Sequence, residues 1–108
     1  MQTCDIAIRR MQIEDLDAVV TIENITFPKP WTRDSFSHDL TDNPAARWLV
    51  AEVQGQVVGF VGMWVIFDQS EVTNIAVHPE HRREGIGRLL LAAGLQYVAN
   101  LGASSCTL

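Results

Sequence analysis

The sequence predicts one α/β domain of the α+β type over residues 1–108, with the element order β-α-α-β-β-β-α-β. Two observations predict this fold class. Apolar residues recur at helical spacing near both ends of the chain, and the middle carries consecutive β-prone stretches separated by short turns. A chain of 108 residues with 47% apolar content can fill one hydrophobic core, and no linker or internal repeat divides it.

The first half of the chain is expected to form a strand and two helices. Ile6 to Arg10 alternate apolar and polar residues, as a short strand does. Acidic residues then crowd the start of a helix, where negative charge is favourable, and the prolines of segment 27–30 end that helix. Thr32 is the expected N-cap of a second helix that carries Phe36 and Leu40. The acidic residues are Glu14, Asp15 and Asp17, and the apolar residues of the first helix are Leu16, Val19 and Val20.

The middle of the chain is expected to form three consecutive strands. Residues 47–53 and 57–67 are rich in β-prone residues and flank a turn at 54–56. A second turn at 68–70 leads into a strand from Glu71 to Val77. That strand ends before Pro79, because proline cannot donate to a strand ladder.

A long helix and the beginning of another strand complete the chain. Gly102 is the expected residue just past the helix, and the strand is expected from Ser104 to Leu108. One helical stripe should face the core, and we expect the single tyrosine, Tyr97, to pack within it. The stripe consists of Ile86, Leu89, Leu90, Ala93, Tyr97 and Leu101.

The composition argues against several classes of function. A formal net charge of −5 with only 8 basic residues does not suit direct nucleic-acid binding, because phosphate contacts need a basic surface. An acidic surface suits a cationic peptide or an amine better. The N-terminus does not resemble a secretory leader and no apolar stretch approaches ~18 residues, which favours a cytoplasmic protein that does not contact a membrane. Cys4 and Cys106 are too far apart in sequence to indicate a disulfide framework, and no metal site is predicted.

The segment from His78 to Arg88 carries the strongest chemical signal. Its two glycines, Gly85 and Gly87, lie between a strand and a helix, so backbone N–H groups and the helix dipole can approach an anionic group such as a pyrophosphate. Three of the 8 basic residues fall within this segment: Arg82, Arg83 and Arg88. The alternative is that the glycines only make a tight turn and that the arginines form a solvated face.

The pattern Arg82-x-x-Gly85-x-Gly87 resembles the Q/R-x-x-G-x-G/A signature of the GNAT superfamily of N-acetyltransferases. The preceding strand, 74–77, is similar to the strand before that signature in the family. The segment Phe27-Pro28-Lys29-Pro30-Trp31 and the strand 73–77 further resemble the bacterial ribosomal-protein-alanine N-acetyltransferases, the RimI type. The likeness spans essentially the whole chain.

The resemblance implies a mixed, largely antiparallel sheet flanked by helices, with acetyl-CoA in an opening between the fourth and fifth strands and no metal. It implies that the cosubstrate meets Ile75, Ala76, Val77, Arg83, Glu84, Gly85, Ile86, Gly87 and Arg88. It further implies that Phe27, Pro28 and Trp31 wall the entrance of a peptide substrate, although a hydrophobic plug under the loop is the alternative for these residues.

By the same resemblance, the acceptor is a protein N-terminal amine, namely the N-terminal alanine of a ribosomal protein. The family's general base, general acid, final helix and closing strands are then expected beyond Leu108, so that the chain is a C-terminally truncated domain. Glu71 begins the fourth strand with the same side-chain parity as Thr73, Ile75 and Val77, which makes it a candidate substitute base facing the cleft; the alternative, at that end of the strand, is a solvated residue. Two alternative functions stay open: a CoA-binding module without catalysis, and a small-molecule amine acetyltransferase. The strand at the C-terminus also allows a homodimer.

Overall fold

The computed structural model describes residues 6–103 and 105–107. Cys4, the side chain of Cys106 and the predicted strand residues Ser104 and Leu108 lie outside the described part. The predicted element order is confirmed: β1 (Ile6–Arg10), α1 (Leu16–Thr26), α2 (Arg33–Asp42), β2 (Ala46–Val53), β3 (Gln56–Ile66), β4 (Gln69–Val77), α3 (Ile86–Asn100) and β5 (Ser105–Thr107). Two short 3₁₀ helices, η1 (Ile13–Asp15) and η2 (Pro79–His81), precede α1 and follow β4.

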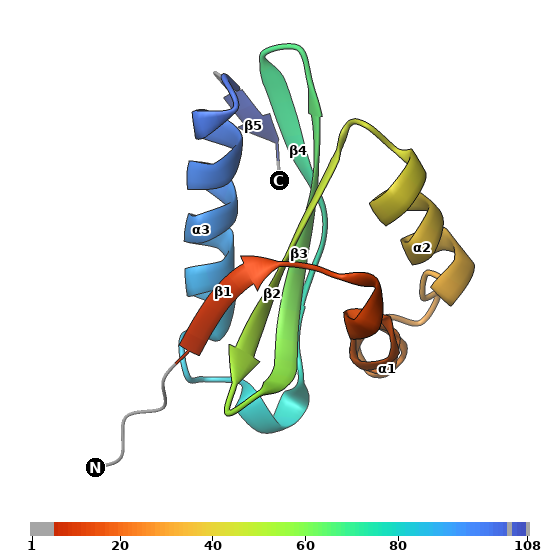
Figure 1. Cartoon of the computed structure of the whole chain (residues 1–108). Coiled ribbons are helices and arrows are strands. Elements are labelled where there is room, and N and C mark those ends of the chain that lie inside the picture. The colour runs from red at the N-terminus through yellow and green to blue at the C-terminus, as the bar shows by residue number, and fades with distance from the viewer. Residues whose placement is uncertain (1–5, 104, 108) are drawn as a thin grey trace.

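The strands form one five-stranded sheet in the order β1-β2-β3-β4-β5. Strands β1 to β4 pair antiparallel with one another, whereas β5 pairs parallel with β4. The predicted mixed and largely antiparallel sheet is confirmed. Helix α3 covers one face of the sheet, and α1 and α2 lie on the other (Figure 1). No helix in the described ranges has both the length and the apolar character that a bilayer crossing requires.

The β4–β5 pair is short, and this shapes the molecule around the end of β4. β5 meets β4 only along Gln69 to Glu71, at the beginning of the longer strand. Residues 72–77 pair with β3 on one side, and among the described residues no strand covers their other side. The two strands therefore separate toward the C-terminal end of β4, and the outer backbone edge of that strand is left open.

Each face of the sheet has its own hydrophobic core. Leu16, Val19 and Phe36 pack with Trp48 and Phe60 beneath α1 and α2. The α3 stripe differs from the predicted one, because its buried residues are Ile86, Leu90, Gly94 and Val98. Leu89 and Leu101 are 47% and 44% exposed. Tyr97 packs against this second core, as predicted. A Cβ on Gly94 would lie 2.7 Å from Sδ of Met63, so the missing side chain allows α3 to approach the sheet closely.

Local signals set most of the element boundaries. Oγ1 of Thr32 accepts a hydrogen bond from the backbone N–H of Ser35 at 3.1 Å, which confirms the predicted N-cap of α2. Gly102 has a φ of +99° just past α3, as predicted for a residue that ends a helix. The second hairpin turn is tighter than predicted. Phe67 takes a φ of +57°, and Gln69 and Ser70 already belong to β4.

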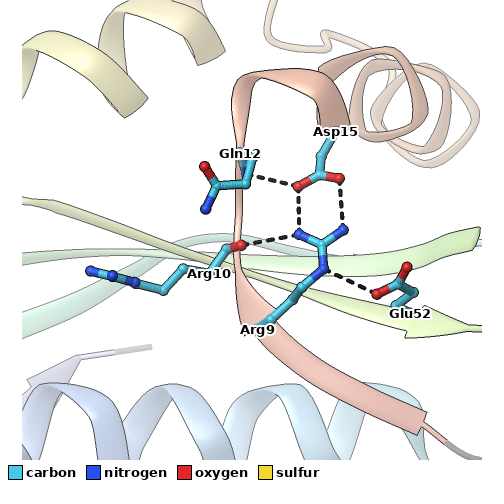
Figure 2. A network of polar contacts seen from close by, with 5 residues as sticks. All are labelled: Arg9, Arg10, Gln12, Asp15 and Glu52. Carbon is cyan, nitrogen blue, oxygen red and sulfur yellow. Dashed lines mark hydrogen bonds and ion pairs between the residues drawn. The ribbon is translucent and has the colours of Figure 1, made fainter. Parts of the chain in front are cut away.

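One polar network joins β1 to the start of α1 and to β2 (Figure 2). Both terminal nitrogens of Arg9 donate to the carboxylate of Asp15, at 2.8 and 2.9 Å, and its Nε donates to Glu52 at 3.0 Å. Asp15 also accepts from the backbone N–H of Gln12 at 2.7 Å, which orders the entry into η1. The Arg9 hydrogen bonds lower the pKa of Asp15 below its ordinary value, because they stabilise the ionised carboxylate.

Candidate functional site

A hollow of about 700 Å³ lies where the open edge of β4 meets the start of α3. We call it the β4–α3 hollow. Its wall contains every residue that the sequence predicted for the cosubstrate except Glu84, whose carboxylate instead lies 3.3 Å from Nδ1 of His81. Two residues that had not been predicted, Thr26 and His81, also line it, and so does Arg82, which the sequence analysis singled out as one of the three arginines of this segment. The full lining is Thr26, Ile75, Ala76, Val77, His81, Arg82, Arg83, Gly85, Ile86, Gly87 and Arg88.

The backbone around Gly85 is arranged for an anion. Gly85 is the N-cap of α3 and has a φ of +80°, a conformation that L side chains rarely adopt. Its carbonyl oxygen accepts the N–H of Leu89 at 3.0 Å. The N–H groups in the first turn of α3 have no partners within the helix, and they carry the positive end of the helix dipole. Such a helix N-terminus binds phosphate oxygens well.

Arginine side chains add positive charge to the same wall. Arg83 and Arg88 are exposed, and none of the described carboxylates forms an ion pair with either. The side chain of Arg82 is held against the end of β4, because its Nε donates a hydrogen bond to the carbonyl oxygen of Val77 at 3.0 Å. The hollow therefore gathers cationic groups in a chain whose formal net charge is −5.

The orientation of the β4 backbone follows from its hydrogen bonds. The N–H of His78 donates to the carbonyl oxygen of Val58 in β3 at 2.8 Å, so it points into the sheet. Because neighbouring strand residues alternate, the N–H and carbonyl of Val77 point to the outer edge, where Arg82 reaches that carbonyl. Ile75 has the same orientation as Val77. The open edge thus presents backbone donors and acceptors to the β4–α3 hollow.

A second hollow, of about 320 Å³, lies between the end of α1 and the middle of β4. We call it the α1–β4 hollow. It brings together the three predicted peptide-entrance residues, Phe27, Pro28 and Trp31. Trp31 also packs against Phe36 and Trp48, with ring centroids 5.3 and 5.7 Å apart, so it belongs to the core as well as to the wall. The full lining is Glu23, Phe27, Pro28, Lys29, Trp31, Thr73 and Asn74.

Glu23 is a site residue that the sequence reasoning missed. Its side chain is only 1% exposed although it carries a carboxylate. Its Oε2 accepts the backbone N–H of Trp31 at 2.9 Å, and Nδ2 of Asn74 lies 3.3 and 3.4 Å from its two oxygens. The sequence pattern could have identified it, because Glu23 continues the spacing of the apolar residues Leu16 and Val19 along α1 and so lies on the buried face of the helix.

The predicted side-chain parity of Glu71 with Ile75 and Val77 is wrong, whereas the alternative of a solvent-exposed Glu71 agrees with the structure. Met63 pairs with Val72 and Gly62 with Asn74, so Thr73 is an extra residue in β4 and the alternation shifts there. Glu71 lies opposite Trp64, whose Nε1 donates to Asp39 in α2, whereas Ile75 packs into the core beneath α3. Glu71 and Ile75 therefore face opposite sides of the sheet, and Glu71 does not line the β4–α3 hollow.

The chain is similar in sequence to known N-acetyltransferases. The protein is 42% identical over 90 residues to a Bacillus subtilis protein provisionally named as a ribosomal protein bS18-alanine N-acetyltransferase, a match that covers 83% of this chain and 60% of the relative. It is 31% identical over 86 residues to the Escherichia coli K12 ribosomal protein bS18-alanine N-acetyltransferase, covering 78% of this chain and 55% of the relative. The chain thus spans somewhat more than half the length of these relatives.

Solved structures agree in fold. The Escherichia coli ribosomal-protein-S18-alanine N-acetyltransferase superposes with a TM-score of 0.82 at 25% identity, covering 92% of this chain and 63% of that one. A PaiA N-acetyltransferase from Thermoplasma acidophilum, solved in complex with coenzyme A, has a TM-score of 0.83 at 18% identity and covers 94% of this chain and 77% of that one. A family model described as the acetyltransferase (GNAT) family matches residues 16–108. The protein belongs to the GNAT acetyltransferase family.

Proposed function

We propose that the protein is an acetyl-CoA-dependent N-acetyltransferase that modifies a protein N-terminal amine, with the N-terminal alanine of a ribosomal protein as its acceptor. The observation that carries this proposal is the open edge of β4 beside the glycine-capped N-terminus of α3, in one hollow with three arginines. The names of the relatives support the choice of acceptor.

The residues of the β4–α3 hollow fit the chemical parts of coenzyme A. The N-terminus of α3, with Arg83 and Arg88, suits the negatively charged pyrophosphate. The outward backbone groups of Ile75 and Val77 suit the amide-bearing pantetheine arm, which they would bind much as a sheet edge binds an added strand. Gly87 leaves room for a close approach, since a Cβ there would meet only Val77, at 3.7 Å.

Transfer of an acyl group requires an electrophile, a neutral amine and a donor for the carbonyl oxygen. Acetyl-CoA, when bound, supplies the acetyl thioester. The outward N–H of Val77 is placed on the open edge to donate to a carbonyl oxygen there. The amine nitrogen forms the new bond to the carbonyl carbon and gives up a proton, the carbon–sulfur bond breaks, and the sulfur keeps its electron pair and takes up a proton, so that no net proton is gained or lost.

An N-terminal amine depends less on deprotonation by the protein than a lysine side chain does. An α-amino group has a pKa of about 7.7–8.0, so roughly a tenth of it is neutral near pH 7, whereas a lysine at about 10.4 is almost fully protonated. The α1–β4 hollow adjoins the open edge of β4 and is lined by Phe27 and Trp31, which suit the first residues of a peptide. As acceptors are ribosomal proteins in this proposal, we expect the protein to act in the cytoplasm.

Calorimetry with acetyl-CoA tests the cosubstrate. We expect one site per chain and much weaker binding of S-acetylpantetheine, which lacks the pyrophosphate. Arg88→Ala should weaken binding of acetyl-CoA, whereas Arg33→Ala should not, because Arg33 lies on α2 and pairs with Asp17. A chain that does not bind acetyl-CoA would overturn the proposal.

Thiol release with a peptide that begins in alanine tests the transfer itself. Acetylation of the α-amino group would support the proposed enzyme. Binding of acetyl-CoA without release of thiol would instead support the reading of the chain as a CoA-binding module. Sedimentation at several protein concentrations would test the predicted homodimer through the C-terminal strand.

A further inference from the structure

The α1–β4 hollow contains a buried carboxyl group, that of Glu23, which forms no ion pair with any described residue. Glu23 is 1% exposed, and its contacts in the described structure are the N–H of Trp31 and the amide of Asn74. Lys29 lines the same hollow but is exposed, and none of the described ion pairs includes it or Glu23. A buried carboxylate normally has a cationic partner or a full set of donors, because removing its charge from water is costly.

Two more oxygen atoms at the same place lack hydrogen bonds. Oγ1 of Thr73 and Oδ1 of Asn74 are buried and have no partner, and Asn74 is only 8% exposed. Both residues line the α1–β4 hollow, and both lie at the bulge that interrupts β4. Buried acceptors without donors are rare in folded proteins, so a cluster of them suggests that a ligand supplies the donors.

We propose that Glu23, Asn74 and Thr73 form the binding site for the α-ammonium group of the acceptor peptide; this inference rests on the proposed function. An ammonium group brings one positive charge and three N–H donors, which matches a carboxylate and two unpaired oxygens. A matched hydrogen bond to a charged group is about twice as strong as a neutral one.

The position of the cluster fits this role. Thr73 and Asn74 directly precede Ile75 in β4. Thr26 lies in the last turn of α1, between Glu23 and Phe27. Ile75 and Thr26 line the β4–α3 hollow, so residues close together in β4 and at the end of α1 line the two hollows. An amine held by Glu23 therefore lies next to the strand edge that we assign to the acetyl group, which explains how the acceptor is oriented toward it.

The test compares two peptides of the same sequence, one beginning with a free alanine and the other with Nα-acetylalanine. Binding is measured by calorimetry with saturating coenzyme A, which cannot react. We expect the wild-type protein to bind the free amine about tenfold or more tightly than its acetylated counterpart, a difference typical of a charge-assisted contact. In Glu23→Gln this preference should disappear, since Gln keeps an acceptor for Trp31 but loses the charge.

Two further variants separate amine recognition from a structural role. Glu14→Gln removes an exposed carboxylate of η1 outside the hollow and should keep the preference. Thr73→Val removes an oxygen that has no partner, so it should reduce the preference without lowering stability, and it serves as the test if Glu23→Gln does not fold.

The inference is overturned if the wild-type protein binds both peptides equally or binds neither, or if Glu23→Gln weakens both by the same factor. If Glu23→Gln does not fold, Thr73→Val replaces it as the test. In that case an unchanged preference in Thr73→Val overturns the inference. The failure of the proposed function is read from different measurements on the wild-type protein: acetyl-CoA does not bind, or it binds and no thiol is released with the alanine peptide.

Discussion

The guanidinium of Arg82 is hydrogen-bonded through Nε to the carbonyl oxygen of Val77 at 3.0 Å. The contact ties the loop that contains Gly85 to the last residue of β4, and both residues line the β4–α3 hollow. Arg82 also lies 3.5 Å from Oγ1 of Thr26, at the end of α1. One exposed side chain thus connects three elements around the proposed acetyl-CoA site.

Arg82→Ala should weaken acetyl-CoA binding by about tenfold, because one charge-assisted hydrogen bond that orders the loop is worth about 1.5–3 kcal/mol and part of it is lost to solvent screening. Calorimetry of the variant measures the change. The matched control is Arg47→Ala, since Arg47 also donates to backbone carbonyl oxygens but lies outside the hollow. Equal affinities of Arg82→Ala and the wild-type protein would contradict the role of Arg82.

Gly85→Ala should lower the free energy of unfolding by about 1–2 kcal/mol, because an L residue is strained in the left-handed conformation. Nothing lies within 4 Å of the added Cβ, so the cost comes from the φ of +80° and not from a clash. Gly87→Ala should fold as well as the wild-type protein, since its Cβ would meet Val77 at an ordinary 3.7 Å. Urea unfolding of both variants provides the measurement, and equal losses would refute this distinction.

Gly62→Ala should destabilise the protein by about 1–3 kcal/mol or more, as overpacking does. The added Cβ would lie 2.3 Å from the ring of Trp48, which is held by the 2.6 Å hydrogen bond from Nε1 to Asp39 and cannot move aside easily. The control is Gly94→Ala, whose Cβ meets the flexible side chain of Met63 and also gains helix propensity. Thermal unfolding should rank Gly62→Ala clearly below Gly94→Ala; the reverse order would show that the indole is free to move.

Asp15→Asn should reduce stability at pH 7 by about 1.5–3 kcal/mol, the range for a hydrogen bond to a charged group. Arg9 lowers the pKa of Asp15 in the folded protein, so this stabilisation is present above the ordinary aspartate pKa and is lost as the pH falls through the lowered value. The difference between variant and wild-type protein should therefore shrink in acid below about pH 4. Urea titrations across that range measure it.

The control for Asp15 is Asp17→Asn, which removes an exposed carboxylate paired with the exposed Arg33. Exposed ion pairs contribute about 0–1 kcal/mol, so this variant should change stability little. A stability difference for Asp15→Asn that did not depend on pH would mean that the carboxylate acts by packing and not by its charge.

The sequence predicted the elements where a local signal decides the structure. Ile6 to Arg10 form the expected strand, Thr32 caps its helix, and Gly102 takes the left-handed conformation just past α3. The sequence also predicted the loop with Gly85, because a glycine between a strand and a helix allows the backbone to take a positive φ at that position. These features depend on a few neighbouring residues, so reading the chain in order was sufficient.

The sequence did not predict which side chains the β4 bulge brings together. An extra residue at Thr73 changes the strand alternation, so Glu71 faces away from Ile75 even though their spacing suggests one face. The α3 stripe was misplaced for a related reason. The close approach at Gly94 selects which side of the helix is buried, and this leaves Leu89 exposed.

The sequence by itself determined the order of helices and strands, the glycine loop and the concentration of arginines beside it. Only the tertiary structure decided that Glu23 is buried beside Asn74, and that β5 meets β4 along Gln69 to Glu71 alone, which sets where the expected opening between the two strands begins. The physical reason is that capping, turns and periodicity act between near neighbours in the chain, whereas burial and strand pairing depend on residues far apart in sequence, such as Glu23 and Asn74, which are 51 positions apart.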